Sequence, residues 1–373
     1  MQSPKSIEMS EVCCTKGQKI VGVVLCRNEW GLIAVSISYA LLNHVDEVYV
    51  LDHSSDDETR NVLCRLKNIW GERLKVFEIR DVAFDQEAMT NTLIHFAKSS
   101  DPDWIYVFDA DEFLLVDSGY SLKSVVQGAT PDQIAISYSV DNFISTEDFD
   151  EYSLADYRKL RYKSVPARPY SAASASEEIY AGRSTFFDYP FPPKVVFRRS
   201  DLIRLQAGSH QVYYFGNSAK VGPDKRVRCA HLTFPTMKRL ATKARMGEEF
   251  AKKGFPAFHG WQAQLIYKLE KEGRLDWFWG RHSIPKNAEG KLQPPAHVID
   301  HDFVEALDST LAFLEDVFGS LNIPKFENGP MPDSPAAESM IPMHQVVQLC
   351  HTLLNQMDPL IRIVDSLQSK KAK

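Results

Sequence analysis

WIYVFDADEF (Trp104 to Phe113) is an apolar run that ends abruptly in three carboxylates. Its first five residues have the length and the aromatic and β-branched content of a strand buried on both faces, as in a covered parallel sheet. Asp109 and Asp111 follow the carboxyl end of that strand, which is where ligands bind in an open α/β sheet. Two carboxylates spaced by one residue suit a divalent cation that carries phosphate. The stretch predicts a metal-diphosphate site, with a simple turn cap as the alternative.

Strand and helix patterns alternate along the first third of the chain. Apolar runs of strand length occur at 19–26, 47–51, 74–79 and 104–108, and helical patterns separate them. The helix after the second strand is expected to be capped by Ser55, with Glu58 three residues on, and to end at Gly71. This alternation predicts an α/β fold in which helices cover both faces of a mostly parallel, Rossmann-like sheet.

Polar residues follow each of these four strands. They are Arg27-Asn28-Glu29, Asp52, Arg80-Asp81 and Asp109-Ala110-Asp111. Because parallel strands end at a common edge, we expect these groups to gather there. No G-x-G-x-x-G follows the first strand, and no G-x-x-x-x-G-K-[ST] occurs anywhere, so bound phosphates would have to be held by a metal ion and side chains.

The bulk composition is that of an ordinary soluble protein. The chain has 373 residues, a formal net charge of −6 and 25% charged residues, which argues against a general nucleic-acid binder. No apolar run approaches the ~20 residues needed to cross a membrane, and residues 1–19 lack the apolar segment of a signal peptide. Six cysteines without a C-x-x-C pair indicate reduced thiols and argue against zinc. We therefore expect a cytoplasmic protein.

Three motifs in order resemble those of the GT-A glycosyltransferases. They are VVLCRNE (Val23 to Glu29), LDHSSDDET (Leu51 to Thr59) and the stretch from Trp104 to Phe113. The similarity is greatest to the glycosyltransferase family 2-like group with a D-x-D-E-F motif, and it covers roughly residues 20–247. The resemblance implies a GT-A fold, a nucleotide-sugar donor, a Mn²⁺ or Mg²⁺ cofactor and a role in polysaccharide biosynthesis.

The resemblance also implies site residues. Asp52 matches an acid that binds the uracil of a UDP-sugar. Asp109 matches the first acid of the D-x-D motif, which lies near the ribose and the metal ion. Asp111 matches the acid that binds the metal ion. A late histidine completes the metal shell, with His231 as first choice and His210 as second. Nucleotide contacts are expected from Cys26, Arg27, Asn28, Glu29, Asp52, Arg80, Asp109, Ala110 and Lys243.

The base for an inverting transfer is harder to assign, because the family's usual E-D motif is not evident. Such a reaction needs a carboxylate that removes the proton of the acceptor hydroxyl. Asp141, directly after an expected strand at 133–140, is the first candidate, and Glu151 is the second. Residues 194–197 are expected as a strand along the sheet edge near the donor.

The expected organisation has five parts. A flexible leader (1–18) precedes a GT-A domain (19–255) with a donor half (19–140) and an acceptor region (141–255). A helical extension (256–322), a Pro-rich linker (323–342) and a helical tail (343–373) follow. We expect the tail to dock on its own domain, with self-association or a partner helix as alternatives. Its basic end, 370–373, is expected to be solvated, with contact to the inner face of an anionic membrane as the alternative.

The leading hypothesis is a metal-dependent glycosyltransferase that uses a UDP-sugar and a glycan or glycolipid acceptor, with no nucleic-acid partner. A sugar-phosphate nucleotidyltransferase would need a Gly-rich basic loop after the first strand, where Cys26 to Glu29 stand instead. A D-x-D-x-T phosphatase would need a threonine where Phe113 stands. The remaining alternative is a binding or scaffold protein that has kept the fold and lost catalysis.

Overall fold

The computed structural model describes residues 18–80, 84–216, 219–256, 260–286 and 294–318. The expected leader, apart from Gln18, lies outside the described residues. The expected linker (323–342), the tail (343–373) and the self-association through that tail also lie outside them.

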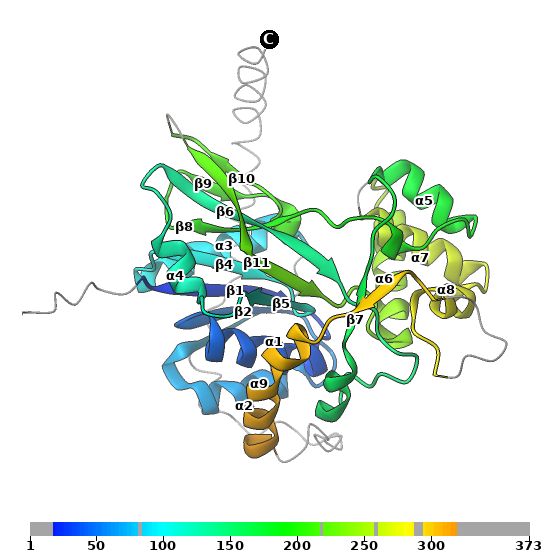
Figure 1. Cartoon of the computed structure of the whole chain (residues 1–373), viewed down its shortest axis with the longest axis horizontal. Coiled ribbons are helices and arrows are strands. Elements are labelled where there is room, and N and C mark those ends of the chain that lie inside the picture. The colour runs from blue at the N-terminus through cyan, green and yellow to red at the C-terminus, as the bar shows by residue number, and fades with distance from the viewer. Residues whose placement is uncertain (1–17, 81–83, 217–218, 257–259, 287–293, 319–373) are drawn as a thin grey trace, which may run out of the picture.

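A central sheet of eight strands organises the described chain (Figure 1). Six strands point in one direction, while β8 and β5 run antiparallel to their neighbours, so the expected mostly parallel sheet is confirmed. In spatial order the strands are β3 (Leu74–Ile79), β2 (Glu47–His53), β1 (Ile20–Cys26), β4 (Trp104–Phe108), β8 (Lys194–Arg198), β6 (Gln133–Asn142), β11 (Lys220–His231) and β5 (Glu112–Val116).

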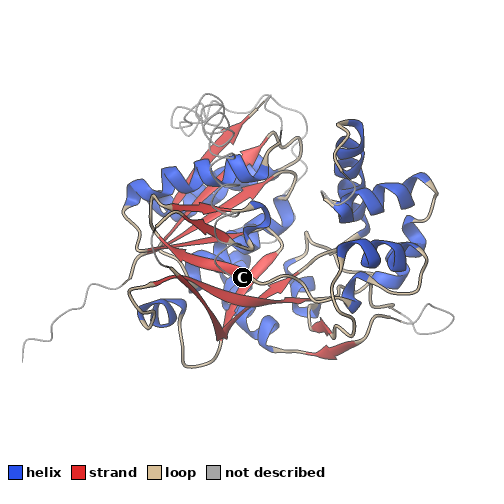
Figure 2. Cartoon of the chain, turned by 90° about the horizontal axis from the view of Figure 1, so that it is seen from above, coloured by secondary structure: helices blue, strands red, loops and turns tan. Residues whose placement is uncertain are grey.

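Both faces of the sheet are covered, which explains the nearly continuous apolar character of its strands (Figure 2). Along β1, Ile20 and Val24 point to one face, and Val21 and Val23 to the other. The first face is covered by α1 (Trp30–Asn43), α2 (Thr59–Trp70), α4 (Leu122–Gln127) and α9 (Asp302–Phe318). The second is covered by α3 (Gln86–Ala97) and the hairpin of β9 (Ile203–Leu205) and β10 (Val212–Tyr214).

The sheet curls at the end of β4. In a flat sheet β4 and β5 would lie about 19 Å apart, because four spacings of about 4.8 Å separate them. Only residues 109–111 connect the two strands, and the step from Phe108 to Glu112 can span at most about 14 Å. The strands between them therefore curve around the Asp109–Asp111 turn, so their ends surround it.

Four helices form a third apolar cluster, beside the sheet (Figure 1). They are α5 (Ala172–Tyr180), α6 (Met237–Lys252), α7 (Trp261–Lys271) and α8 (Leu275–His282). The backbones of α6 and α7 touch, because a Cβ on Gly247 would lie 2.0 Å from the carbonyl oxygen of Ala263. Packing is therefore continuous across the domain boundary expected at residue 255. The two-stranded sheet of β7 (Tyr162–Ser164) and β12 (His297–Ile299) connects this region to α9.

Two local expectations were wrong. Helix α2 begins at Thr59 without a side-chain cap from Ser55, because the Ser55 hydroxyl donates to the Asp52 carboxylate instead. The strand at 194–198 is not at the sheet edge: β8 lies between β4 and β6, where Val195, Val196 and Phe197 are buried. Its side chains are apolar in both directions, as an interior strand requires.

Candidate metal and nucleotide site

The ends of five strands meet where the sheet curls, and each brings polar side chains to one place. β11 lies between β6 and β5, and its register sets His231 beside Asn142 on β6 and beside Glu112 on β5. β8 runs antiparallel, so its first residue lies at the same edge where its neighbours end. The assembled groups are Asp109 and Asp111 after β4, Glu112 on β5, Asn142 on β6, Lys194 on β8 and His231 on β11.

His231 is oriented for metal binding through its Nε2 atom. Its Nδ1 lies 2.8 Å from Asn142 Oδ1, which also accepts a hydrogen bond of 2.8 Å from the Thr233 hydroxyl. Because the amide oxygen can only accept, Nδ1 carries the proton and donates it, which leaves the lone pair on Nε2. Metal-binding histidines are typically held this way by a partner on the other ring nitrogen.

Asp111 supplies a second ligand atom beside His231. Its Oδ2 lies 3.6 Å from His231 Nε2. Two atoms that bind one ion at about 2.1 Å can be at most about 4.2 Å apart, so this spacing fits a shared divalent cation. An imidazole and a carboxylate together suit Mn²⁺ well, and Mg²⁺ less well. Asp111, Glu112 and His231 have ligand atoms within 4.8 Å of one another, which makes them a possible metal-binding group of the described residues.

Lys194 lies against two of the surrounding acids. Its side chain is 1% exposed, and its Nζ lies 2.8 Å from Asp109 Oδ2 and 2.5 Å from Glu112 Oε1. Burial alone would lower the pKa of Lys194, but these carboxylates raise it above its usual range, so the ammonium stays charged. Asp109 is not in the metal-binding group, and its Oδ2 accepts from Lys194 Nζ, so metal binding by Asp109 stays a prediction.

Asp111 is ionised in this environment. Burial would raise its pKa, but His231 when it is protonated, together with Lys243 and Lys194, lowers the pKa well below its usual range. The Asp111 carboxylate is therefore available as an anionic ligand at neutral pH.

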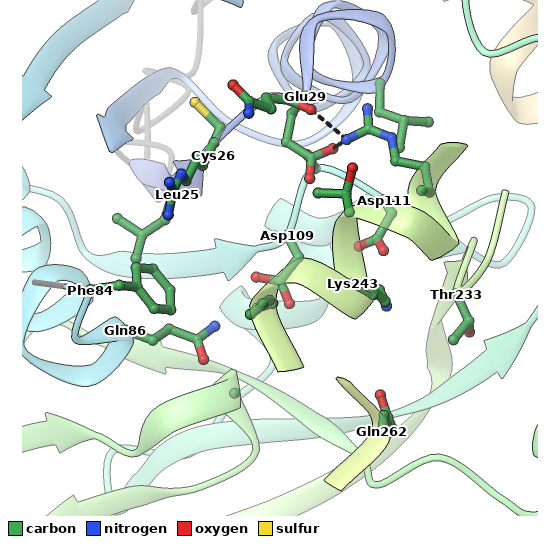
Figure 3. A pocket seen from close by; sticks show the side chains of 18 of the residues that line it. Leu25, Cys26, Glu29, Phe84, Gln86, Asp109, Asp111, Thr233, Lys243 and Gln262 are labelled. Atoms are coloured by element: carbon green, nitrogen blue, oxygen red, sulfur yellow. Dashed lines mark hydrogen bonds and ion pairs between the residues drawn. The ribbon is translucent and has the colours of Figure 1, made fainter. Parts of the chain in front are cut away.

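A cavity of about 590 Å³ opens from this group of side chains (Figure 3). One wall is the turn after β1 and the other is a face of α6, and Asp109 and Asp111 line the cavity near Lys243 (Figure 3). Thr236 caps α6 by accepting from the backbone N–H of Arg239. The expected site residues that line the cavity are Cys26, Arg27, Asn28, Glu29, Asp109, Ala110, Asp111, His210, His231 and Lys243.

The turn after β1 is fixed by the segment that follows β2. Asn28 has a left-handed backbone (φ 59°), which asparagine tolerates better than most residues. Its N–H donates to Ser55 Oγ at 2.9 Å, and its side chain exchanges hydrogen bonds of 2.7 and 2.9 Å with Asp56. The LDHSSDDET motif thus positions the first cavity wall.

Arg239 ties α6 to this turn. Its guanidinium donates to the Asn28 carbonyl oxygen at 2.6 Å and pairs with Glu29 at 2.6 Å and with Glu151 at 2.6 Å. Burial, with the nearby charges of Asp111 and Glu151, raises the pKa of Glu29 to about 8, although Arg239 and Lys243 oppose this shift.

Asp52 lies beside Cys26, its partner in the β1–β2 register, and does not line the cavity. Its carboxylate is buried: Oδ1 accepts from Ser55, and Oδ2 has no hydrogen-bond partner. Burial raises the pKa of Asp52, while the bond from Ser55 opposes the shift.

Both candidates for the catalytic base lie elsewhere. Asp141 accepts from Arg228 at 3.2 Å and lies 3.8 Å from Lys163, in an ion-pair group that does not line the cavity. Glu151 is 1% exposed and engaged by Arg239, so it cannot reach an acceptor hydroxyl. Neither expectation is supported, since each carboxylate already serves a structural cation.

Two further candidates, Arg80 and His210, are not in the metal-binding group. Arg80 pairs with Glu78 at the end of the outer strand β3 and is not a cavity residue. His210 lines the cavity but is not in the metal-binding group: its Nδ1 lies 3.1 Å from the carbonyl oxygen of Pro193, and the Phe191 ring packs against both His210 and His231.

The sequence reasoning missed Lys194, Arg239 and Asn142. The sequence did contain a sign that Lys194 has acidic partners. Lys194 begins the apolar run KVVF, and a lysine buried in such a strand needs acidic partners. Arg239 and Asn142 had no such sign, because their partners come from strands and loops far away in the chain.

No protein-family model matches the chain, and no curated protein matches it. Its structure is similar to a mannosyltransferase from Pyrobaculum calidifontis in complex with GDP-Man and Mn²⁺, at 15% identity and a TM-score of 0.35, over 95% of this chain and 85% of that chain. It is also similar to S. aureus TarS 1–349 in complex with UDP-GlcNAc, at 12% identity and a TM-score of 0.35, over 70% of this chain and 75% of that chain. Among the described residues, no helix is both long and apolar enough to cross a bilayer.

Proposed function

We propose that this protein is a metal-dependent glycosyltransferase that moves a sugar from a nucleoside diphosphate, a UDP-sugar in particular, to a hydroxyl of a glycan, a glycolipid or another acceptor. The observation that carries the proposal is the pair of Asp111 Oδ2 and His231 Nε2, 3.6 Å apart in the lining of a 590 Å³ cavity. The three motifs that resemble GT-A glycosyltransferases contribute residues to this cavity or support its wall.

The residues divide into three roles. Asp111 and His231 would hold a divalent cation, which supplies positive charge to the diphosphate leaving group. Lys243, which lines the cavity and acts electrostatically on Asp111, would add a second positive charge there. The Cys26–Glu29 turn, supported by Ser55 and Arg239, would contact the nucleoside.

In the proposed reaction, the acceptor oxygen forms a bond to the anomeric carbon while the bond from that carbon to the phosphate oxygen breaks. The electron pair of the broken bond stays on the nucleoside diphosphate, and the hydroxyl proton passes to a base. In-line attack from the opposite face would invert the anomeric configuration.

A second candidate is a nucleotide-binding protein that does not catalyse transfer. One observation favours it: Asp141 and Glu151, the two carboxylates expected to act as base, are engaged by Arg228 and Arg239. Such a protein would bind the donor with metal and leave its glycosidic bond intact.

A thermal-shift panel with Asp111→Asn tests the donor site. UDP, GDP, CDP and ADP would each be added with EDTA, Mg²⁺ or Mn²⁺. We expect UDP to raise the melting temperature only with metal, since a ligand at about 100 times its Kd adds about 2.7 kcal/mol of stability. We expect the variant to lose this effect, because it lacks the anionic ligand.

Asp117→Asn is the matched control, since Asp117 is exposed, follows β5 and does not line the cavity. It should respond to UDP as the wild type does. If no nucleotide shifts the wild type under any metal condition, the donor site is refuted. Release of UDP from UDP-glucose or UDP-GlcNAc, measured on the same samples, separates the transferase from the protein that only binds.

A further inference from the structure

Lys194 is a buried cation in the middle of the candidate metal site. It is the first residue of β8, which enters the sheet antiparallel between β4 and β6, so its side chain arrives where the neighbouring strands end. The side chain is 1% exposed and bonds to Asp109 and Glu112 at 2.8 and 2.5 Å. An ammonium in such a place has a large effect on any second cation nearby, because charges interact strongly at short range in a partly dry site.

Glu112 is the group most affected. It has a ligand atom within 4.8 Å of those of Asp111 and His231, so by position it could be a third metal ligand. Its side chain is 1% exposed, and Lys194 is paired with its Oε1. A carboxylate bound to a buried ammonium is a poor ligand, since the ammonium both occupies its oxygen and repels the ion.

Asp109 is restricted in the same way but remains accessible. Lys194 bonds to its Oδ2, while the side chain as a whole is 40% exposed. Asp109 is therefore left as a hydrogen-bond acceptor at the cavity surface.

We infer that Lys194 is a positioning residue that limits the protein's metal ligands to Asp111 and His231 by keeping the nearby Glu112 carboxylate engaged. Two protein ligands bind Mn²⁺ weakly, so the ion is retained when a diphosphate supplies further oxygens. Lys194 thereby makes metal binding depend on the nucleotide. This inference rests on the proposed function, because it concerns the same metal site.

The test is a Mn²⁺ titration of the nucleotide-free protein, followed by the EPR signal of the free ion. Lys194→Met removes the charge and keeps most of the volume of the side chain. We expect this variant to bind Mn²⁺ at least about tenfold more tightly than the wild type, because Glu112 becomes a ligand. Lys194→Met combined with Glu112→Gln should return the affinity close to the wild-type value. A loss of packing alone would weaken binding, so the sign of the change separates the two explanations.

Lys98→Met is the matched control, since Lys98 is also a partly buried lysine, paired with Asp201 at 3.0 Å and not part of the cavity. It should leave Mn²⁺ affinity unchanged. Glu112→Gln alone should also leave it unchanged, and this variant keeps the test decisive if Lys194→Met fails to fold. A large drop in affinity for Glu112→Gln, or unchanged or weaker binding for folded Lys194→Met, would overturn the inference.

Failure of the inference about Lys194 can be told apart from failure of the proposed function. The titration contains no nucleotide, so it reports only on the protein ligands. If Lys194→Met gains Mn²⁺ affinity but the wild type binds no nucleotide in the thermal-shift panel, the role of Lys194 stands and the proposed transferase does not.

Discussion

Arg239 shows how one side chain can hold a site together without touching the substrate. It connects the first turn of α6 to the turn after β1 and to the buried Glu151. The backbone carbonyl oxygen of Glu151 lies so near Gly31 that a Cβ there would approach it to 2.7 Å, so this region is tightly packed. The two cavity walls are therefore joined through buried charges.

Arg239→Gln should strongly destabilise the protein. The substitution leaves Glu151 and Glu29 without their cation, and breaking a buried ion pair costs about 3–5 kcal/mol. Urea unfolding at pH 7, followed by circular dichroism, would measure the loss of free energy. Arg239→Gln with Glu151→Gln should be more stable than the single variant, because one unpaired charge is removed. Equal stability of the two variants would contradict this account.

At the scale of elements, the sequence predicted most of the fold. The apolar runs at 74–79 and 104–108 gave β3 and β4 with the bounds that the structure has. These elements follow from local periodicity, turn residues and caps. The central position of β8 did not follow, because its order in the sheet depends on partners far away in the chain.

The same distinction between local sequence pattern and partners far away in the chain applies to the candidate site. The prediction of a metal site at Asp111 and His231 rests on two strands whose apolar pattern is plain, and the structure brings these two side chains together. Lys194 and Arg239 were not assigned, because a role for a cation depends on which acids tertiary packing brings to it. The arginine partners of Asp141 and Glu151 come from β11 and α6, so their engagement was not visible in the sequence either.

His282 links α8 to the 3₁₀ helix at Phe186–Asp188 and should make this contact sensitive to acid. Its Nδ1 donates to the Phe278 carbonyl oxygen at 2.7 Å, and its Nε2 accepts from the Phe186 N–H at 2.9 Å, so the ring is neutral. Burial lowers the pKa of His282 from 6.5 to about 3. A proton on Nε2 would remove the bond from Phe186.

The free energy of unfolding should therefore decrease as the pH is lowered below about 6.5, because the unfolded chain then binds a proton that the folded chain does not. Burial of His44, whose pKa falls to about 4, adds to the same trend. Urea unfolding at pH 7, 6 and 5 would measure it. His282→Leu should be less stable at pH 7 but lose less on acidification. An unchanged slope in this variant would show that His282 does not contribute.

At the scale of the molecule, α9 returns from the end of the described chain to cover the face formed by α1 and α2 (Figure 1). Phe303, Leu307, Leu311 and Leu314 form its buried stripe. The last described helix thus follows the helical cluster in sequence but packs against the core of the central sheet.

Leu311→Ala should destabilise the whole described fold. Leu311 is 0% exposed, and truncation of a buried leucine to alanine costs about 2–5 kcal/mol. Leu202→Ala is the control: Leu202 is 46% exposed, so its loss should change stability by less than about 0.5 kcal/mol. The urea midpoint, monitored by both circular dichroism and tryptophan fluorescence, would measure the effect. A variant that loses only α9, with the sheet still folded, would show that α9 is an independent unit.

The interior position of β8 has a consequence for the order in which the protein forms as it is made. Lys194 follows Phe108 by 86 residues, so a ribosome that adds about 5–20 residues per second needs about 4–17 s to reach it after completing β4. Throughout that interval the nascent chain displays an unpaired edge of β4 and two acids, Asp109 and Glu112, without their lysine. Synthesis of β8 then supplies the strand that pairs with both β4 and β6 and the lysine that pairs with both acids, so until that point the open edge of β4 is exposed to unwanted pairing.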